Sequence, residues 1–552
     1  MTKERSRWIA LVFISAAISL VIIDGTIVNT IFPSIINALE LDSTDVQWVQ
    51  ESYVLVFASL LLVWGSIADR IGRKRLLLIG IAIFVAASVW AGLSEDASSM
   101  ILARVLQGFG GSMVLPTTLS LVNASFQGKE RGIAFAVWGA TIGGMVAVGP
   151  VLGGWLATDF GADGWRLAFN INLPLGLIVM AGLWWWAKES KQEQRVPGVD
   201  IVGAVLSVIM FATLVFGLIE GRVYGWWDAS TKNQFTLGEF AWPTEGLSII
   251  PVSLAISAAG FVLFILWERA RAKANKAVLL DLDLFKVGSF RNGSIAALII
   301  SMGEFGILFA IPLWLQNVLL LSPIESGMVL LWLAGGAFLA SGVTGGLSGK
   351  VSPKVLVQGG VALELVGAIG IALFANTEAG MWSIAPFLFL YGIGVGMATA
   401  QLTGVIMVDV PMDKIGQASG SQSTVRQVGS ALGIAVLGTM LFTGVQSSLE
   451  TRIADQGVSA EQSGAIVQLV VDSAGGVIPG LEMALQNPQD SNTPALSPEV
   501  AKQITEDAGQ AFTDGAKSSA WAAAAFLLLG LISTFNIGSA KVQTAAKTGS
   551  KE

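Results

Sequence analysis

The stretch GSIADRIGRKR, from Gly65 to Arg75, decides the fold class of this chain. It lies between two apolar runs that are each long enough to cross a bilayer. One carboxylate, two glycines and four basic residues are concentrated there in a tight turn, an arrangement for which a soluble domain has little use. In a membrane protein the positive charges hold such a turn on the inner side, and glycine lets two helices and their connector approach closely. The stretch therefore predicts a short cytoplasmic hairpin between two membrane-spanning helices.

The composition of the whole chain also indicates a membrane protein. Of its 552 residues, 53% are hydrophobic and only 13% are charged, whereas soluble domains carry about 25% charged residues. The 64 glycines are spread through the apolar runs, which suggests close helix packing. The net charge of −7 gives no reason to expect nucleic acid as a partner.

Two residue types are missing, and their absence restricts the chemistry. The chain has no Cys and no His, which excludes disulfides, thiolate nucleophiles, Ser–His–Asp catalysis and His metal sites. We therefore expect no enzyme activity and no cofactor, with a proton gradient as the energy source. Any proton carrier that works near neutral pH must then be an Asp or Glu whose proton affinity is increased by burial.

Fourteen apolar segments are long enough to span a bilayer with some tilt. Their expected limits are 8–33, 46–68, 76–94, 100–124, 131–157, 167–187, 199–220, 247–267, 291–320, 326–348, 355–375, 381–407, 418–443 and 518–538. With these spans, 24 of the 32 Lys and Arg residues fall on the side of the N-terminus. Because one miscounted span would reverse every later segment, this bias supports an even number of spans with both termini in the cytoplasm.

Four further stretches combine glycine, proline and polar residues within or beside the apolar segments. They are IDGTIVNTIFP (Ile23–Pro33), ILARVLQGFGGSMVLP (Ile101–Pro116), GATIGGMVAVGPVLGGWL (Gly139–Leu156) and GWRLAFNINLPLGL (Gly164–Leu177). In the third of these, small residues along one face allow a neighbouring helix to pack backbone to backbone, and the proline removes one backbone hydrogen bond.

Together with the turn at Gly65–Arg75, these stretches resemble, in the same order, the motifs of the fourteen-helix drug:proton antiporters of the major facilitator superfamily. The resemblance covers most of residues 8–445, and it departs at Ile31 and Phe32, where that family usually has Ala-Leu. It implies an all-α polytopic membrane protein with the major facilitator fold, in which two six-helix bundles and two extra transmembrane helices make fourteen in total. The bundles would rock to expose a central cavity to either side in turn.

This architecture divides the chain into five parts. The expected parts are the N-terminal six-helix bundle at 1–190, two inserted helices with flanking loops at 191–285, helices 9–13 at 286–443, a long extracytoplasmic loop at 444–517, and helix 14 with a cytoplasmic tail at 518–552. The loop is polar but contains amphipathic pieces, so a small helical cap and a partly disordered loop are two alternatives for its structure.

The resemblance also implies a function, namely a proton-coupled exporter of lipophilic, cationic compounds in a bacterial cytoplasmic membrane. Its expected partners are a small-molecule substrate, protons and the lipid bilayer, and the chain is expected to act as a monomer. A dedicated exporter of one endogenous metabolite, lipid or peptide-like product would share these motifs and is the main alternative. A non-transporting membrane sensor is a further one.

Acidic residues inside the apolar segments are the candidates for proton coupling. A carboxylate that faces lipid would be expelled or held neutral, so these side chains are expected to face a cavity or one another. Asp24, in the first motif, is the first candidate, followed by Glu304 and Glu364; the alternative for Glu364 is a hydrogen bond to a neighbouring helix. The resemblance implies that Arg104 bonds to helix 1 and tunes a carboxylate, whereas a side chain that snorkels to the outer surface is the alternative.

Polar and aromatic residues near the expected cavity are candidates for substrate contact. Trp rings can hold flat lipophilic cations by stacking or by cation–π contact. A carboxylate near the outer end of helix 2 could contact a drug cation or simply be solvated at the rim. The expected substrate-binding set is Glu51, Asn29, Gln107, Trp138, Trp314 and Gln316.

Two regions are expected to gate the cavity. Asp69 and Arg73 are four residues apart and can pair if the helix continues; the resemblance implies a latch, whereas a turn that only sets orientation is the alternative. For the glycines of helix 5, the resemblance implies a seal that opens and closes, with plain tight packing as the alternative. Asp409 could pair with Arg426 near the inner end of helix 12. The gating set is Gly65, Asp69, Arg70, Gly72, Arg73, Gly149, Pro150, Gly153, Gly154, Asp409 and Arg426.

Overall fold

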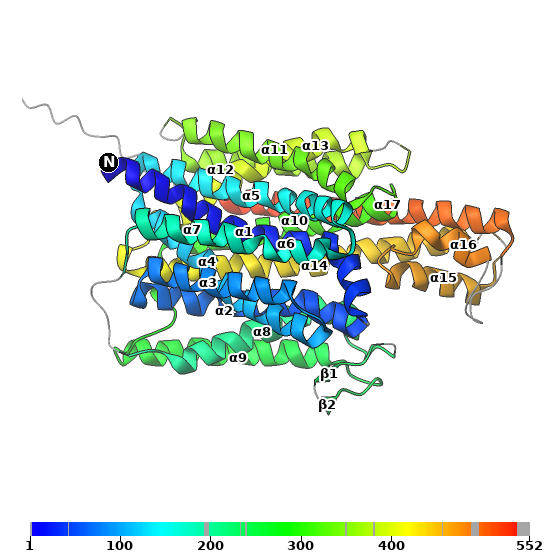
Figure 1. Cartoon of the computed structure of the whole chain (residues 1–552), viewed down its shortest axis with the longest axis horizontal. Coiled ribbons are helices and arrows are strands. Elements are labelled where there is room, and N and C mark those ends of the chain that lie inside the picture. The colour runs from blue at the N-terminus through cyan, green and yellow to red at the C-terminus, as the bar shows by residue number, and fades with distance from the viewer. Residues whose placement is uncertain are drawn as a thin grey trace, which may run out of the picture.

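Helices make up nearly all of the structure (Figure 1), a computed structural model. It describes residues 3–41, 43–191, 198–231, 233–237, 240–347, 350–378, 381–454, 456, 458–486 and 496–537. Within these ranges, thirteen helices are long and apolar enough to cross a membrane. Helix α5 (Gly128–Asp159) carries the remaining predicted span, 131–157. The predicted all-α polytopic fold is therefore confirmed.

The first third of the chain folds into one bundle of helices. Its elements are α1 (Lys3–Leu39), α2 (Ser43–Ile71), α3 (Arg73–Gly92), α4 (Ala97–Ser125), α5, η1 (Gly161–Asp163), α6 (Gly164–Asn170) and α7 (Asn172–Trp186). Helices α6 and α7 together form one span that is interrupted at Ile171. Six crossings result, as the sequence predicts.

An inserted pair of helices follows, and then the second bundle. The pair comprises α8 (Ile201–Tyr224) and α9 (Ile249–Lys273), joined through the ribbon β1 (Thr236–Leu237) and β2 (Phe240–Ala241), in which Thr236 pairs with Ala241. The second bundle comprises η2 (Leu282–Lys286), α10 (Gly288–Asn317), α11 (Pro323–Leu347), α12 (Pro353–Phe374), η3 (Met381–Ser383), α13 (Ala385–Ile406), η4 (Met412–Lys414), α14 (Ile415–Ala454), α15 (Ala460–Asp472), η5 (Ile478–Gly480), α16 (Leu481–Gln486) and α17 (Pro498–Thr534).

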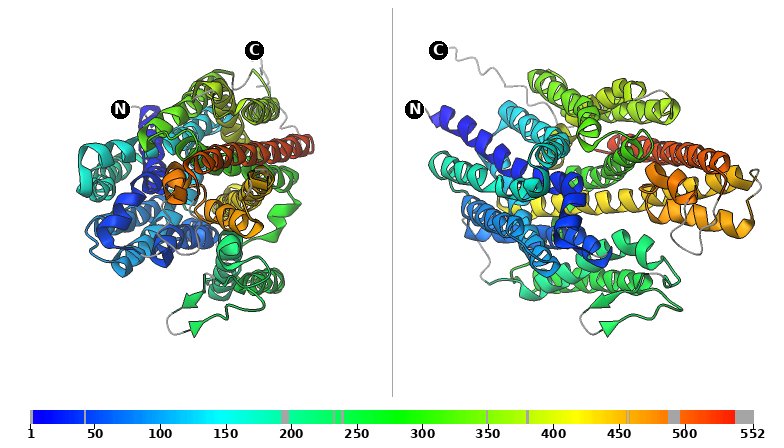
Figure 2. Two further views of the ribbon diagram at one scale, coloured as in Figure 1. Left: turned by 90° about the vertical axis from the view of Figure 1, so that its right-hand side faces the viewer. Right: turned by 45° about the vertical axis from the view of Figure 1, so that its right-hand side comes forward.

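The two bundles meet at several helix pairs. Helix α2 packs against α14, and α5 packs against α11 and α13. Helices α8 and α9 pack on each other, and α8 also packs on α2 and α14, so the pair lies at the outer edge of the molecule in Figures 1 and 2. We call the end of the molecule at which α1 begins the N-terminal face, and the other end the opposite face.

A helical cap lies at the opposite face, where α14 extends past the thickness of a bilayer. Helix α14 has 40 residues, or about 60 Å, which is twice the ~30 Å hydrocarbon thickness. Its extension and the first turns of α17 pack with α15 and α16 around Ile466, Leu481 and Phe512, which are buried. Figure 2 shows this cap projecting from the bundles.

The cap corrects two helix limits expected from the sequence. Segment 418–443 is only the apolar part of α14, and segment 518–538 overlaps only the last turns of α17, because both helices extend through polar sequence at the opposite face. The limits of the five expected parts of the chain stay predictions.

Candidate functional site

A buried carboxylate and guanidinium pair lies inside the first bundle. Arg104 Nη1 of α4 is 2.8 Å from Asp24 Oδ2 of α1, and both residues are 1% exposed. The other oxygen, Asp24 Oδ1, accepts hydrogen bonds from Gln107 Nε2 at 2.9 Å and from Asn172 Nδ2 at 3.1 Å. Three helices, α1, α4 and α7, therefore meet at a single carboxylate, and each of its oxygens has a donor.

The guanidinium of Arg104 has further partners on α2 and α4. Its Nε donates to the Val49 carbonyl at 3.2 Å, its Nη1 donates to Gln107 Oε1 at 2.8 Å, and its Cζ atom lies over the ring of Tyr53, 4.3 Å from the ring centre. Arg104 thus lies inside the bundle and does not snorkel to the outer surface. A charge at this depth is expensive unless it is paired, and the contacts above supply the pairing.

The spacing of the α4 motif explains how this cluster is built. Arg104, Gln107, Gly108 and Gly111 recur at helical intervals, so they share one face of α4. A Cβ atom on Gly108 would lie 2.6 Å from the Tyr53 carbonyl oxygen. Only glycine allows α4 to approach α2 this closely, and that approach brings Tyr53 onto the guanidinium.

A second buried ion pair lies in the second bundle. Glu304 Oε2 of α10 is 3.3 Å from Arg426 Nη2 of α14, and Glu304 Oε1 accepts a hydrogen bond from Thr399 of α13 at 3.2 Å. Arg426 therefore does not pair with Asp409, which is exposed; that expectation was wrong. The reason is that Arg426 lies well inside α14, on the side that faces α10.

Glu364 of α12 is the third acid inside the bundles. It is fully buried, and within the described residues neither carboxyl oxygen has a hydrogen-bond partner. The expected alternative of a hydrogen bond to a neighbouring helix is therefore not found. Helix α13 packs closely against the Glu364 side chain, because a Cβ atom on Gly394 would lie 2.6 Å from Glu364 Cγ. An intramembrane carboxyl in such surroundings is a candidate functional group by default.

Asp69 joins the two bundles at the N-terminal face. Its Oδ1 lies 2.7 Å from Arg73 Nη2, and its two oxygens accept the backbone N–H groups of Gly416 and Gln417, each at 3.1 Å. Those N–H groups belong to the first turn of α14, where helix N–H groups lack intrahelical partners and favour an anion. A carboxylate from the first bundle thus completes the N-terminus of a helix in the second.

The pair Asp69–Arg73 does not depend on a continuous helix, as the sequence suggested it would. Helix α2 ends at Ile71 and α3 begins at Arg73, with Gly72 between them at φ +110°, a conformation that favours glycine. Gly65, four residues before Asp69, lies against α14, since a Cβ atom there would be 2.6 Å from Gly420 Cα. Gly65 therefore lets α2 touch α14, while Gly72 allows the turn between α2 and α3.

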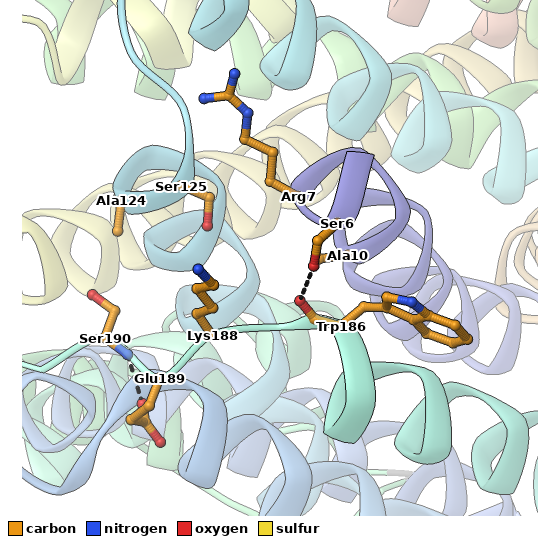
Figure 3. A pocket seen from close by; sticks show the side chains of 9 residues that line it. All are labelled: Ser6, Arg7, Ala10, Ala124, Ser125, Trp186, Lys188, Glu189 and Ser190. Atoms are coloured by element: carbon orange, nitrogen blue, oxygen red, sulfur yellow. Dashed lines mark hydrogen bonds between the residues drawn. The ribbon is translucent and has the colours of Figure 1, made fainter. Parts of the chain in front are cut away.

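The segment after α7 holds this turn in place. Glu189 accepts the N–H groups of Lys74 and Arg75 at 3.0 and 3.1 Å, and Ser190 accepts the N–H of Arg73 at 2.9 Å. A polar cavity of about 440 Å³ lies beside this segment, between α1, α4 and the end of α7 (Figure 3). Arg70 donates to the Gly198 carbonyl on the way to α8. The turn is therefore tied to both neighbouring segments.

Helix α5 contacts α1 on one side and α11 on the other. Pro150 lies within a continuous helix. A Cβ atom on Gly153 would lie 2.9 Å from Ile27 of α1, and one on Gly154 would lie 3.0 Å from the Ile324 backbone of α11. Gly149 meets Thr26 of α1. Helix α5 is thus in contact with the helix of Asp24 and with the second bundle.

The Gly149–Thr26 contact makes a testable prediction about stability. Gly149→Ala is expected to lower the apparent melting temperature of the detergent-purified protein, since overpacking costs about 1–3 kcal/mol. Gly144→Ala is the matched control: among the described residues its Cβ would meet only Phe338, at 3.7 Å, and Ala is the better helix former by about 1 kcal/mol. Intrinsic fluorescence of the 18 Trp residues follows the thermal unfolding of both variants. Equal melting temperatures would show that α1 and α5 are loosely packed at this point.

The expected substrate-binding residues do not form one group. Trp138 and Trp314 are buried, and their indole N–H groups donate to Thr118 at 3.3 Å and to Thr513 at 2.9 Å. Gln316 is half-buried. Gln107 belongs to the Asp24 cluster, and the side chains of Glu51 and Asn29 lie outside the described residues. Substrate contact by any of these residues stays a prediction.

Sequence reasoning missed Tyr53, Ser88 and Thr399. Ser88 Oγ accepts from both Gln107, at 2.7 Å, and Asn172, at 3.2 Å. One signal was present, because the chain has only three Tyr residues. Tyr53 lies on Arg104, and the fully buried Tyr391 lies on α13 beside the helix of Glu364.

Comparison with known proteins supports a transport function. A family described as Major Facilitator Superfamily matches residues 14–434. The chain is 32% identical to the "Probable actinorhodin transporter" of Streptomyces coelicolor, with 82% of this chain and 75% of that protein covered. It is 30% identical to "Multidrug efflux pump LfrA" of Mycolicibacterium smegmatis, with 85% and 86% covered. The chain is 28% identical to "Multidrug resistance protein Stp" of Mycobacterium tuberculosis, with 88% of this chain and 86% of that protein covered.

A solved structure shares the fold. The human organic anion transporter MFSD10 (TETRAN) superposes with a TM-score of 0.59, covering 97% of this chain and 100% of that one, at 11% sequence identity. At this identity the likeness is one of fold alone.

Proposed function

Because this chain belongs to the major facilitator superfamily, we propose that it is a drug:proton antiporter that exports lipophilic, cationic compounds from a bacterial cell. The observation that carries the proposal is the buried pair of Asp24 and Arg104 at 2.8 Å. A carboxylate and a fixed cation inside a membrane bundle form a site that can exchange a proton. The curated relatives named for multidrug efflux and for export of an antibiotic support the direction of transport.

The exchange follows from charge balance at Asp24. A proton bound there neutralises the carboxylate and removes its attraction for Arg104, while the hydrogen-bond donors Gln107 and Asn172 lose an anionic acceptor. A cationic substrate near the cluster restores the balance only if the proton leaves. Proton and cation therefore compete, and binding of one favours release of the other.

Helix α1 connects this event to the contact between the bundles. Thr26, two residues after Asp24, packs on Gly149 of α5, and α5 packs on α11 at Gly154. A shift of α1 on loss of the Asp24–Arg104 bond would thus alter the α5–α11 contact. Rocking of the bundles about α2–α14 and α5–α11 would open the N-terminal face and the opposite face in turn.

The pair Glu304–Arg426, with Glu364, is the corresponding group in the second bundle. We assign it to proton coupling together with Asp24, because it places two carboxyl groups inside the membrane region of that half. From the excess of basic residues in the segments at the N-terminal face, we infer that this face and both termini are cytoplasmic. The Asp69 contacts then form a cytoplasmic gate, to which Arg70 and Gly72 contribute.

Proton flux in reconstituted vesicles tests the proposal. Purified protein in liposomes with an imposed pH gradient is given lipophilic cations one at a time, and a pH-sensitive dye follows the lumen. We expect each transported cation to increase proton movement over that in protein-free vesicles. Cation movement without proton movement would reject antiport, and binding without either would favour a sensor.

A dedicated exporter is the second candidate, favoured by the relative named for a single compound, actinorhodin. The same assay separates it from a multidrug pump. One strong response among many chemically unrelated compounds favours a dedicated exporter, whereas several weak responses favour a multidrug pump.

A further inference from the structure

The inserted helices enclose a cavity that the transport mechanism does not use. It has a volume of about 820 Å³ and lies between α8 and α9 on one side and α2, α10 and α14 on the other, with the η2 segment at one end. This volume falls in the range of about 300–1,000 Å³ seen for ligand pockets. The lining is apolar except for three hydroxyl side chains and Arg269.

The cavity is long and follows α9. Its lining runs from Leu254 to Arg269 on that helix, which is a rise of about 22 Å at 1.5 Å per residue. Phe261 and Val262, at its rim, are more than half exposed, and α9 lies at the outer edge of the molecule (Figures 1 and 2). In a bilayer this rim faces hydrocarbon, and the shape suits an acyl chain that lies along the helix.

The charge at the N-terminal face end of the cavity is positive. Segment 269–291 contains six basic residues and two acidic ones. Both acids already have partners, since Asp281 pairs with Lys414 and Asp283 pairs with Lys286. Arg269 is exposed, lines the cavity and makes no ion pair with any residue in the described ranges. Basic residues at the end of a membrane span attract anionic headgroups.

We propose that this cavity binds an anionic phospholipid, with one acyl chain along α9 and the headgroup phosphate at Arg269. Leu62 of α2 and Ser421 of α14 both line the cavity. A Cβ atom on Gly420 would lie 3.3 Å from the Leu62 carbonyl oxygen, so these are also the helices that touch between the bundles. The lipid therefore contacts both halves beside the α2–α14 boundary.

Native mass spectrometry of delipidated protein tests the proposal. Phosphatidylglycerol and phosphatidylcholine are added back at equal concentration, and the fraction of protein that retains one lipid is compared. We expect phosphatidylglycerol to be retained over phosphatidylcholine. Arg269→Gln should reduce its retention about fivefold, the effect of one basic residue at an anionic headgroup.

Matched variants separate the cavity from the general surface. Ala258 lines the cavity and Ala259 does not, although both are exposed on α9. Ala258→Phe should lose phosphatidylglycerol and Ala259→Phe should retain it. Lys273→Gln, which removes the same charge from the same helix outside the cavity, should also retain it.

Three results would overturn the proposal. They are equal retention of the two lipids, equal losses in the Ala258 and Ala259 variants, and retention of tetraphenylphosphonium in place of phosphatidylglycerol in a way that depends on Ala258. The last would make the cavity a site for lipophilic cations. Because the readout is binding, the outcome is independent of whether the protein transports protons.

Discussion

Asp24→Asn is expected to reduce substrate-driven proton flux to the level of protein-free vesicles. The amide has the shape of the carboxylate and can still accept a hydrogen bond, but it carries no charge and cannot bind a proton near neutral pH. The exchange between a proton and a cation then has no site in the first bundle. The measurement is the liposome assay described above, with wild-type protein and the variant incorporated in equal amounts.

Folding must be separated from coupling in this experiment. Arg104 is 1% exposed, and removing one member of a buried ion pair costs about 3–5 kcal/mol because the other charge is left without a partner. The double variant Asp24→Asn, Arg104→Gln removes both charges, so we expect it to recover much of the lost thermal stability without recovering proton flux. If Asp24→Asn retains normal coupling, the proton site belongs instead to Glu304 or Glu364.

Asp69→Asn is expected to open the N-terminal face. The substitution removes the anion that pairs with Arg73 and lies at the first turn of α14. A charge at a partly buried helix terminus contributes up to about 2 kcal/mol, so the closed form should lose up to about 30-fold in population relative to the open one.

The chain lacks Cys, so a single pair of spin labels can be introduced without background. Labels at Arg75→Cys and Asp413→Cys lie on the two sides of the contact, both at exposed positions, and pulsed electron paramagnetic resonance measures their separation. We expect the distance distribution to shift toward longer values in Asp69→Asn.

Asp283→Asn is the matched control for this measurement. Its carboxylate is exposed and pairs with Lys286 at 2.6 Å, and that partner holds the pKa of Asp283 below its usual value. At neutral pH the control therefore loses one negative charge at the same face, as Asp69→Asn does. An equal shift in the two variants would mean that net charge, and not the Asp69 contact, keeps the face closed.

The helical spans and their order were readable from the sequence. Apolar segments of about 20 residues must form helices in a bilayer, because no water satisfies their backbone groups. The basic residues in Gly65–Arg75 and in the later inner segments then supply the orientation argument. The motif around Arg104, Gln107 and Gly108 also follows from spacing, since a helix places these residues on one face.

Contacts between distant segments were not readable in this way. Hydropathy does not reveal which polar group an intramembrane charge will meet, and so Arg426 was expected at Asp409 although it pairs with Glu304. The two glycines that let α2 and α14 touch, Gly65 and Gly420, lie 355 positions apart in the chain. The polar ends of α14 and α17 resembled loops because they owe their helical form to packing on each other and on α15 and α16.

By itself the amino-acid sequence determined the number of membrane-spanning segments, their order and the acids that they carry into the membrane, since those properties depend on the local match between apolar length and bilayer thickness. The tertiary structure alone decided that Asp24 meets Arg104 and that Asp69 reaches across to α14. The physical reason is that both contacts depend on how closely glycine-lined helices from separate parts of the chain can approach, and no local pattern encodes that distance.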